Sequence, residues 1–212
     1  MTIRHDGITA EWLGYATLRL EADDTVVYLD PGRYGVLTDE WEPDTPGVGH
    51  PPTRDYAPRD GDIVCVTHIH HYDPDGIRRV AGDDATVVAF EGINVHATDR
   101  DLDRLADLGY EVRDVSMEDE LLVGDVPIWT MPAYNHGDGR NVKGDGTPIH
   151  PKGIGCGFYT MNRHEAADLA EAMAPDLVLP MHYNTFTSLE ADSGAFAEDV
   201  ARRGVPVVLD EN

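Results

Sequence analysis

Lysine is nearly absent from this sequence of 212 residues, where it occurs only as Lys143 and Lys152. Lysine and arginine together number 16, against 40 aspartates and glutamates, so the formal net charge is −24. A surface this acidic repels nucleic acid and anionic membranes, and we expect neither as a partner. Acidic, lysine-poor composition is typical of halophilic proteins, because a Debye length of about 3 Å in 1 M salt screens the self-repulsion. An ordinary acidic protein is the alternative.

Cysteine is also scarce, and long apolar runs are missing. Cys65 in a predicted strand and Cys156 in a glycine-rich turn look like reduced apolar residues, not a disulfide framework. No run reaches the roughly 18 apolar residues of a membrane span, and no basic leader with an apolar core opens the chain. We therefore expect a cytoplasmic protein. No linker rich in Pro, Gly or Ser divides it, so residues 1–212 are predicted to form a single domain.

A cluster of possible metal ligands directly follows a short apolar run. Residues 63–66 are β-branched or small and apolar, which predicts a buried strand. In an extended segment, side chains two residues apart lie on one side, about 6 to 7 Å apart, and one divalent ion can bridge them once the chain bends. A polar loop without metal is the alternative, but so many ligands at a strand end favour metal. These candidates are His68, His70, His71, Asp73 and Asp75.

This stretch resembles the metallo-β-lactamase superfamily, whose usual signature is His-x-His-x-Asp-His. Read without a gap, Tyr72 stands at the family's Asp and Asp73 at its last His. With one residue inserted, Asp73 is the Asp and Pro74 replaces the His. Either alignment removes a ligand of the second metal site, although Asp75 could supply an oxygen.

The opening of the chain resembles one branch of that superfamily. Residues 12–17 and 26–32 are similar to the start of the lactonase-like branch, which includes ascorbate-6-phosphate lactonase. Tyr15 stands where many relatives carry His. Asp30 ends a predicted strand, where it could cap a turn. Alternatively, it could accept a hydrogen bond from a ligand imidazole and fix its tautomer.

Two later segments, residues 132–136 and 149–155, also resemble this branch, in which they flank the metal. The superfamily's third histidine ligand falls here, with His150 as the first choice and His136 as the second. A turn-rich solvated loop is the alternative for both. His182, which follows another predicted strand, closely resembles the family's last metal histidine.

The remaining pattern alternates strands and helices. Hydrophobic alternation and turn residues predict strands at 8–13, 17–21, 25–29, 63–66, 85–90, 121–123, 126–131, 177–179 and 205–209. Helices are predicted at 76–80, at 99–108 after a Thr98 cap, at 166–173 after an Asn162–Glu165 capping box, and at 191–203. Residues 33–60 lack periodicity and predict a long loop.

One expected segment is missing. Relatives of the branch continue from the Gly-x-Gly turn through two strands to a Gly-Asp-Ser or Gly-Asp-Thr loop, whose aspartate bridges two metals. Here Phe158, Tyr159 and Thr160 lead straight to the helix at Asn162. The resemblance therefore implies an α/β fold, a four-layer αβ/βα sandwich of the metallo-β-lactamase type, with a deletion that removes one strand pair and the metal loop.

The function implied by the resemblance is a metal-dependent hydrolase in which metal-bound hydroxide attacks a small-molecule ester, lactone or phosphoester. The cofactor would be zinc or another divalent ion, one or two per chain. A non-catalytic binding protein on the same scaffold and a nuclease are the alternatives, although the charge opposes the nuclease. Lys152 could stabilise a developing oxyanion or bind a substrate phosphate, or it could be a surface lysine. The implied residues are His68, His70, Asp73, Asp75, His150 and His182 for metal, Asp73 and Lys152 for catalysis, and Asp30 and His136 for support of the ligands.

Overall fold

The computed structural model describes residues 2–42, 50–131, 161–187 and 190–210. One compact unit holds the described residues of Met1–Thr130, and a second holds those of Met131–Asp210. The single domain expected from the sequence stays a prediction. Within the described ranges, no helix is both long enough and apolar enough to cross a membrane.

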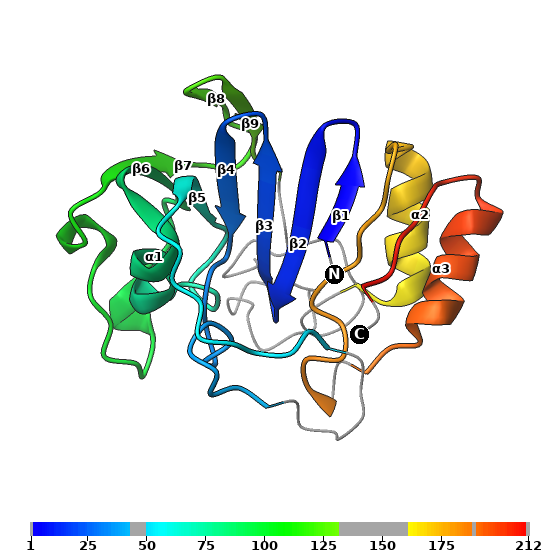
Figure 1. Ribbon diagram of the computed structural model, residues 1–212, viewed down its shortest axis with the longest axis horizontal. Coiled ribbons are helices and arrows are strands. Elements are labelled where there is room, and N and C mark those ends of the chain that lie inside the picture. The colour runs from blue at the N-terminus through cyan, green and yellow to red at the C-terminus, as the bar shows by residue number, and fades with distance from the viewer. Residues whose placement is uncertain (1, 43–49, 132–160, 188–189, 211–212) are drawn as a thin grey trace, which may run out of the picture. The chain divides into compact units, whose positions relative to one another are not determined.

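The described residues of the first unit form a seven-stranded sheet whose spatial order follows the chain order (Figure 1). Neighbours are antiparallel from β1 to β4 and parallel from β4 to β7. This change of direction matters because neighbouring parallel strands end at the same edge of a sheet. The strands are β1 (Thr2–His5), β2 (Ile8–Gly14), β3 (Thr17–Ala22), β4 (Thr25–Leu29), β5 (Gly61–Val66), β6 (Ala81–Phe90) and β7 (Glu111–Val115).

The strands expected at 8–13, 17–21, 25–29, 63–66 and 85–90 are confirmed as β2 to β6. The outermost strands, β1 and β7, were not expected from the sequence. Both lie at an edge of the sheet, and edge strands tolerate charged residues such as Arg4 and Arg113 because they are only partly covered. Their alternating pattern was therefore too weak to predict a strand.

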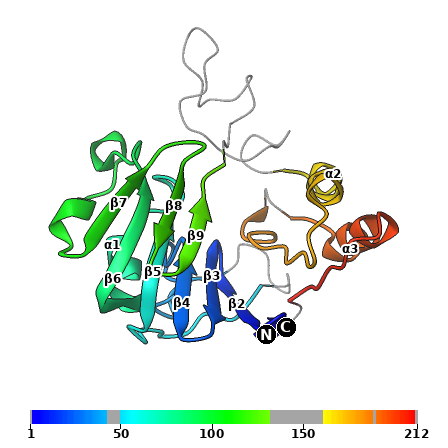
Figure 2. The ribbon, with the colours of Figure 1, turned by 90° about the horizontal axis from the view of Figure 1, so that it is seen from above.

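Both faces of the parallel half of the sheet are covered. On one face lies the expected hairpin, β8 (Glu120–Val123) and β9 (Val126–Trp129), as Figure 2 shows. Helix α1 (Pro74–Val80) contacts β5, and its Ile77 and Val80 are fully buried. Burial of each such side chain contributes about 1.5 to 3 kcal/mol. The hairpin residues Leu121, Val123, Val126 and Ile128 pack against Ile63, Val88 and Val115.

The helix expected from residues 99–108 is wrong. The segment contains only a single 3-10 turn, η2 (Leu105–Asp107), preceded by Arg104 with an extended backbone. The carbonyl of Asp103, which a helix would use internally, accepts a hydrogen bond from the Tyr72 hydroxyl at 2.7 Å. A bond to a distant part of the unit therefore outweighs the local helical pattern. A second 3-10 turn, η1 (Val95–Ala97), follows β6.

The second unit contains two helices that pack on each other, α2 (Arg163–Met173) and α3 (Ser193–Arg202). Helix α2 begins with the expected capping box, in which the Asn162 side chain accepts from the Glu165 N–H at 3.1 Å. The Glu165 carboxylate accepts from the Asn162 N–H at 3.0 Å. The core between the helices is formed by Ala167, Ala170, Phe196, Val200 and Val205.

The two strands expected at 177–179 and 205–209 are wrong in extent. They meet only in an isolated parallel bridge between Val178 and Val207. Pro180 and Pro206 flank this bridge and lack the N–H groups that a longer ladder would need. The pairing therefore stops after one bridge.

Candidate metal centre

Three loops follow the carboxyl ends of β4, β5 and β6, which are neighbours in the sheet. The first loop begins at Asp30 and includes Arg33, the second holds His68–His71, and the third reaches Arg100. Because these strands are parallel, the loops meet at one edge of the sheet, where functional sites of α/β folds are built.

Asp30 is the centre of a hydrogen-bond network at this edge. It is only 4% exposed, and it accepts hydrogen bonds from the N–H and the hydroxyl of Thr67 at 2.8 and 2.7 Å. The same carboxylate lies 2.7 Å from Nδ1 of His71, which donates to it. One buried side chain therefore fixes the start of the histidine loop and the orientation of an imidazole.

This network also decides which ring nitrogens carry hydrogen. The Thr67 hydroxyl has one hydrogen, which it donates to Asp30, so its oxygen accepts from Nδ1 of His68 at 2.9 Å. Nδ1 of His71 likewise carries the hydrogen that it donates to Asp30. In a neutral imidazole the other nitrogen, Nε2, then holds a lone pair, which is the form that binds metal ions.

The rings of the three histidines lie close together. The ring centre of His68 is 4.1 Å from that of His71 and 5.5 Å from that of His70. Oriented imidazoles are ligands for zinc, iron and similar divalent ions, so the chemistry of these donors fits such an ion. They do not complete a site alone, because in the described part of the chain no three histidine, cysteine or acidic side chains are arranged to hold a metal.

Asp73 and Asp75 are engaged at the start of α1. Asp73 is the N-cap of the helix, and its Oδ1 accepts from the N–H groups of Asp75 and Gly76 at 3.1 and 3.2 Å. Its Oδ2 accepts from the N–H of Arg33 at 2.6 Å. Asp75 forms an ion pair with Arg79 at 2.8 Å. As metal ligands, both aspartates would have to give up these bonds.

His182 belongs to the second unit and has a left-handed backbone, with φ of 66°. The buried Thr185 donates its hydroxyl hydrogen to the carbonyl of His182 at 2.8 Å, and its oxygen lies 3.3 Å from Nδ1. A threonine hydroxyl thus orients this imidazole as Thr67 orients His68. Its assignment as a metal ligand stays a prediction.

Three other residues predicted for the site, His136, His150 and Lys152, lie outside the described residues. In contrast, the structure adds His71 and His50 to the residues of this edge. His71 stood among the sequence candidates without being placed in the ligand set. His50 lies in the long aperiodic loop, where nothing beyond its residue type marked it.

His50 holds Tyr15 in place beside the histidine loop. The Tyr15 ring makes an edge contact with His71, with ring centres 5.2 Å apart, and burial raises the pKa of its hydroxyl. Tyr15 has a left-handed backbone (φ 49°), and its N–H donates to Nε2 of His50 at 2.8 Å. Nδ1 of His50 donates to the Pro51 carbonyl at 2.7 Å, so the ring is neutral. The Trp12 and Trp41 rings lie against the His50 ring.

The neutral state of His50 predicts a loss of stability in mild acid. Burial lowers the pKa of His50 from 6.5 to about 4, so between these values the unfolded chain binds more protons. The stability that the neutral His50 contributes to the folded state is fully present above pH 6.5 and is lost as the pH falls toward 4. Allowing for the partial exposure of His50, we expect the free energy of unfolding to fall by about 1 kcal/mol between pH 7 and pH 5.

Urea unfolding at the two pH values measures this effect against His50→Gln, which keeps an acceptor for the Tyr15 N–H but does not titrate. The pH dependence should shrink in this variant and should be unchanged in His96→Gln, because His96 is exposed. Equal pH dependence in the wild type and His50→Gln would show that His50 is not neutral in the folded state.

Comparison with protein families finds a match of residues 9–182 to a model described as a beta-lactamase superfamily domain. A protein of Methanopyrus kandleri named as a metal-dependent hydrolase is 26% identical, over 92% of this chain and 93% of its own. That alignment extends over 226 positions, more than the 212 residues here, so it contains gaps. Gaps are in keeping with a segment that this chain lacks.

Two solved structures have a similar fold. A metallo hydrolase from Ignicoccus hospitalis superposes with a TM-score of 0.62 at 19% identity, covering 96% of this chain and 95% of that one. A protein of Parabacteroides distasonis, described as a putative metal-dependent hydrolase, gives a TM-score of 0.61 at 17% identity, covering 99% and 96%. At such identities the likeness shows the fold alone, and it confirms the expected α/β class.

Proposed function

Since the chain belongs to the metallo-β-lactamase superfamily, whose model matches residues 9–182, we propose that it is a metal-dependent hydrolase of a small-molecule ester, lactone or phosphoester. The observation that carries this proposal is the network in which Asp30 and Thr67 present Nε2 of His68 and His71 at the carboxyl edge of the sheet. The Methanopyrus kandleri relative, matched over nearly its whole length, is named as a metal-dependent hydrolase, which supports the general reaction but not the choice of substrate.

The proposed ligands are histidines above all. His68 and His70 come from the loop after β5, and His150 and His182 from later segments. His71 joins the candidates because its Nδ1 is tied to Asp30. We propose Asp73 and Asp75 only as weaker metal ligands than the histidines, because each carboxylate already has partners in α1.

The metal ion, when bound, lowers the pKa of a water ligand to about 7 and so provides a nucleophile at neutral pH. The residues of the chain prepare the site for it. Asp30 and Thr67 hold the imidazoles in one tautomer, which avoids the cost of reorienting them during the reaction. Tyr15 is 4% exposed, and its ring makes an edge contact with the His71 ring. Lys152 keeps its proposed role of stabilising an oxyanion.

Zinc is the metal that we propose first, with one ion per chain more strongly held than a second. Imidazole ligands suit zinc, and also iron, copper and nickel. The second position is weaker because Tyr72 or Pro74 replaces a family ligand, and because the Gly-Asp-Ser loop is missing from the sequence.

The test combines metal analysis with a substrate panel. Purified protein should contain close to one equivalent of a divalent metal by mass spectrometry, and should hydrolyse at least one of p-nitrophenyl acetate, γ-butyrolactone and bis-p-nitrophenyl phosphate. A chelator should abolish turnover and added zinc should restore it. Bound metal without turnover would favour the non-catalytic binding protein. Absence of both, with no zinc binding tighter than micromolar by calorimetry, would refute the proposal.

A further inference from the structure

Two arginines flank the histidine loop from opposite sides. Arg33 follows β4, and its Nε donates to the carbonyl of His70 at 3.0 Å. Arg100 lies beyond β6, and its Nη2 donates to the carbonyl of Ile69 at 2.9 Å. The histidine loop follows β5, which lies between β4 and β6 in the sheet, so two guanidinium groups are fixed to consecutive carbonyls beside the candidate metal ligands.

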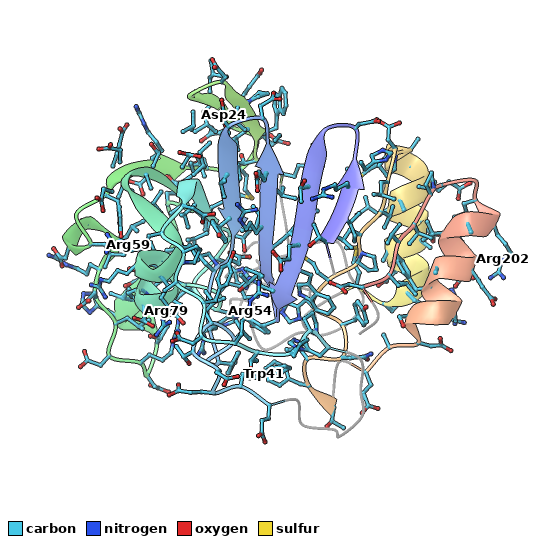
Figure 3. The ribbon with its side chains drawn as sticks, in the orientation of Figure 1. Asp24, Trp41, Arg54, Arg59, Arg79 and Arg202 are labelled. Atoms are coloured by element: carbon cyan, nitrogen blue, oxygen red, sulfur yellow. The ribbon has the colours of Figure 1, made fainter. Side chains whose placement is uncertain are left out.

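Neither guanidinium has an acidic partner among the described residues, although the chain has 40 acidic residues and 16 basic ones. Most other arginines of the first unit form ion pairs with carboxylates. Arg54, Arg59 and Arg79, labelled in Figure 3, each have a carboxylate oxygen at 2.7 to 2.8 Å. Two positive groups with no carboxylate partner in the described part of so acidic a protein indicate a site that binds an external anion.

Asp73 is the acidic side chain near this pair, and its carboxylate is already hydrogen-bonded to backbone N–H groups. The Asp73 carboxylate interacts with the charge of Arg100, but it already accepts hydrogen bonds from the N–H groups of Asp75 and Gly76 at the start of α1, and from the backbone N–H of Arg33 in the loop after β4. Burial, and next the charge of Arg33, lower the pKa of Arg100. Because the two guanidinium groups bond to consecutive carbonyls of one loop, their charges repel each other, and an anion bound by both would relieve that repulsion.

The remaining hydrogen-bond donors suit an oxyanion. Each guanidinium has five N–H groups, of which the bonds to the loop carbonyls use one apiece. The Arg33 guanidinium carbon lies 4.2 Å from the centre of the Tyr34 ring, a cation–π contact that restrains the side chain. Both arginines are half-buried, so solvent and ligands can reach them while the bonds remain directional.

We propose that Arg33 and Arg100 form an anion subsite that binds the carboxylate or phosphate group of the substrate. As the substrate subsite of a hydrolase, it rests on the proposed function, and it narrows the substrate to an anionic ester or lactone or to a phosphoester. An arginine pair recognises such groups through charge-assisted, often bidentate bonds. In a protein of net charge −24, a local positive site is what allows an anionic substrate to approach at all.

The binding test uses inorganic phosphate titrated into the protein by calorimetry, both as purified and after chelation of metal. The wild type should bind phosphate in the millimolar range. Arg33→Gln and Arg100→Gln should each weaken binding about tenfold, since one charge-assisted contact is lost. Arg113→Gln is the matched control, because this exposed arginine on β7 pairs with Glu111 and should leave phosphate binding unchanged.

Lysine variants separate anion binding from support of the loop. Arg33→Lys and Arg100→Lys keep a charge and a donor but lose the planar fork, so they should fold like the wild type and bind phosphate less tightly. Melting temperatures check that every variant is folded. If the chelated wild type fails to bind phosphate, or if Arg33→Gln/Arg100→Gln binds it equally well, the subsite is refuted.

A kinetic comparison separates this inference from the proposed function. For an anionic ester, the arginine variants should raise KM about tenfold, and for a neutral ester they should leave KM unchanged. Phosphate binding without any hydrolysis would sustain the subsite and reject the hydrolase. Hydrolysis in which the variants affect anionic and neutral esters alike would sustain the hydrolase and reject the subsite.

Discussion

Replacing His68 with alanine is expected to lower divalent-metal affinity and hydrolysis by about 100-fold or more. His68 is buried, and Thr67 fixes its ring so that Nε2 holds the lone pair needed for coordination. Loss of one of three or four ligands leaves the ion under-coordinated, a larger change than loss of a hydrogen-bonding partner of a ligand, which costs about 10- to 100-fold. Zinc calorimetry and turnover of a responsive substrate measure the two losses.

The variant needs two comparisons, because a buried side chain is removed. His70→Ala changes a half-buried histidine of the same loop and should weaken zinc binding with a smaller loss of stability. His96→Ala removes an exposed histidine from η1 and should bind zinc as the wild type does. Wild-type zinc affinity in folded His68→Ala and His70→Ala would exclude this loop as the metal site.

Replacing Asp30 with alanine is expected to reduce both stability and metal affinity. The change leaves the Thr67 N–H, the Thr67 hydroxyl and Nδ1 of His71 without their shared acceptor in a buried position. It also places alanine at a left-handed position, with φ of 44°. We expect a loss of about 2 to 4 kcal/mol in unfolding free energy and of about 10- to 100-fold in zinc affinity.

Asp30→Asn separates the two effects, because asparagine tolerates the left-handed backbone and keeps one acceptor oxygen. It should recover much of the stability while zinc affinity stays reduced. Asp62→Asn is the matched control, since Asp62 accepts from the Val26 N–H at 2.8 Å at the other end of β5. A metal affinity that falls equally in the Asp30 and Asp62 variants would mean that Asp30 acts only through the general stability of the sheet.

Local sequence patterns predicted the strands and helices well where burial is periodic and turns have strong signals. The alternation in residues 8–29 and the apolar run before Thr67 gave β2 to β5, and the Asn162–Glu165 pair gave the start of α2. Each pattern reflects bonds or burial within a few residues. The pattern in residues 99–108 misled because the Asp103 carbonyl binds the Tyr72 hydroxyl, a partner 31 residues away.

The same distinction between local and long-range interactions separates the features of the candidate site that the sequence predicted from those that it did not. The sequence by itself placed His68 and His70 at the end of a strand and marked Asp30 as a possible partner of a ligand imidazole, because residue chemistry and strand ends are local properties. Only the parallel pairing of β4 with β5 decided that this partner is His71, 41 residues away. The pairing of β5 with both β4 and β6 likewise places Arg33 and Arg100 on either side of the histidine loop. The sequence could not predict this arrangement, because a local hydrophobic pattern does not show which strands will be neighbours in the sheet.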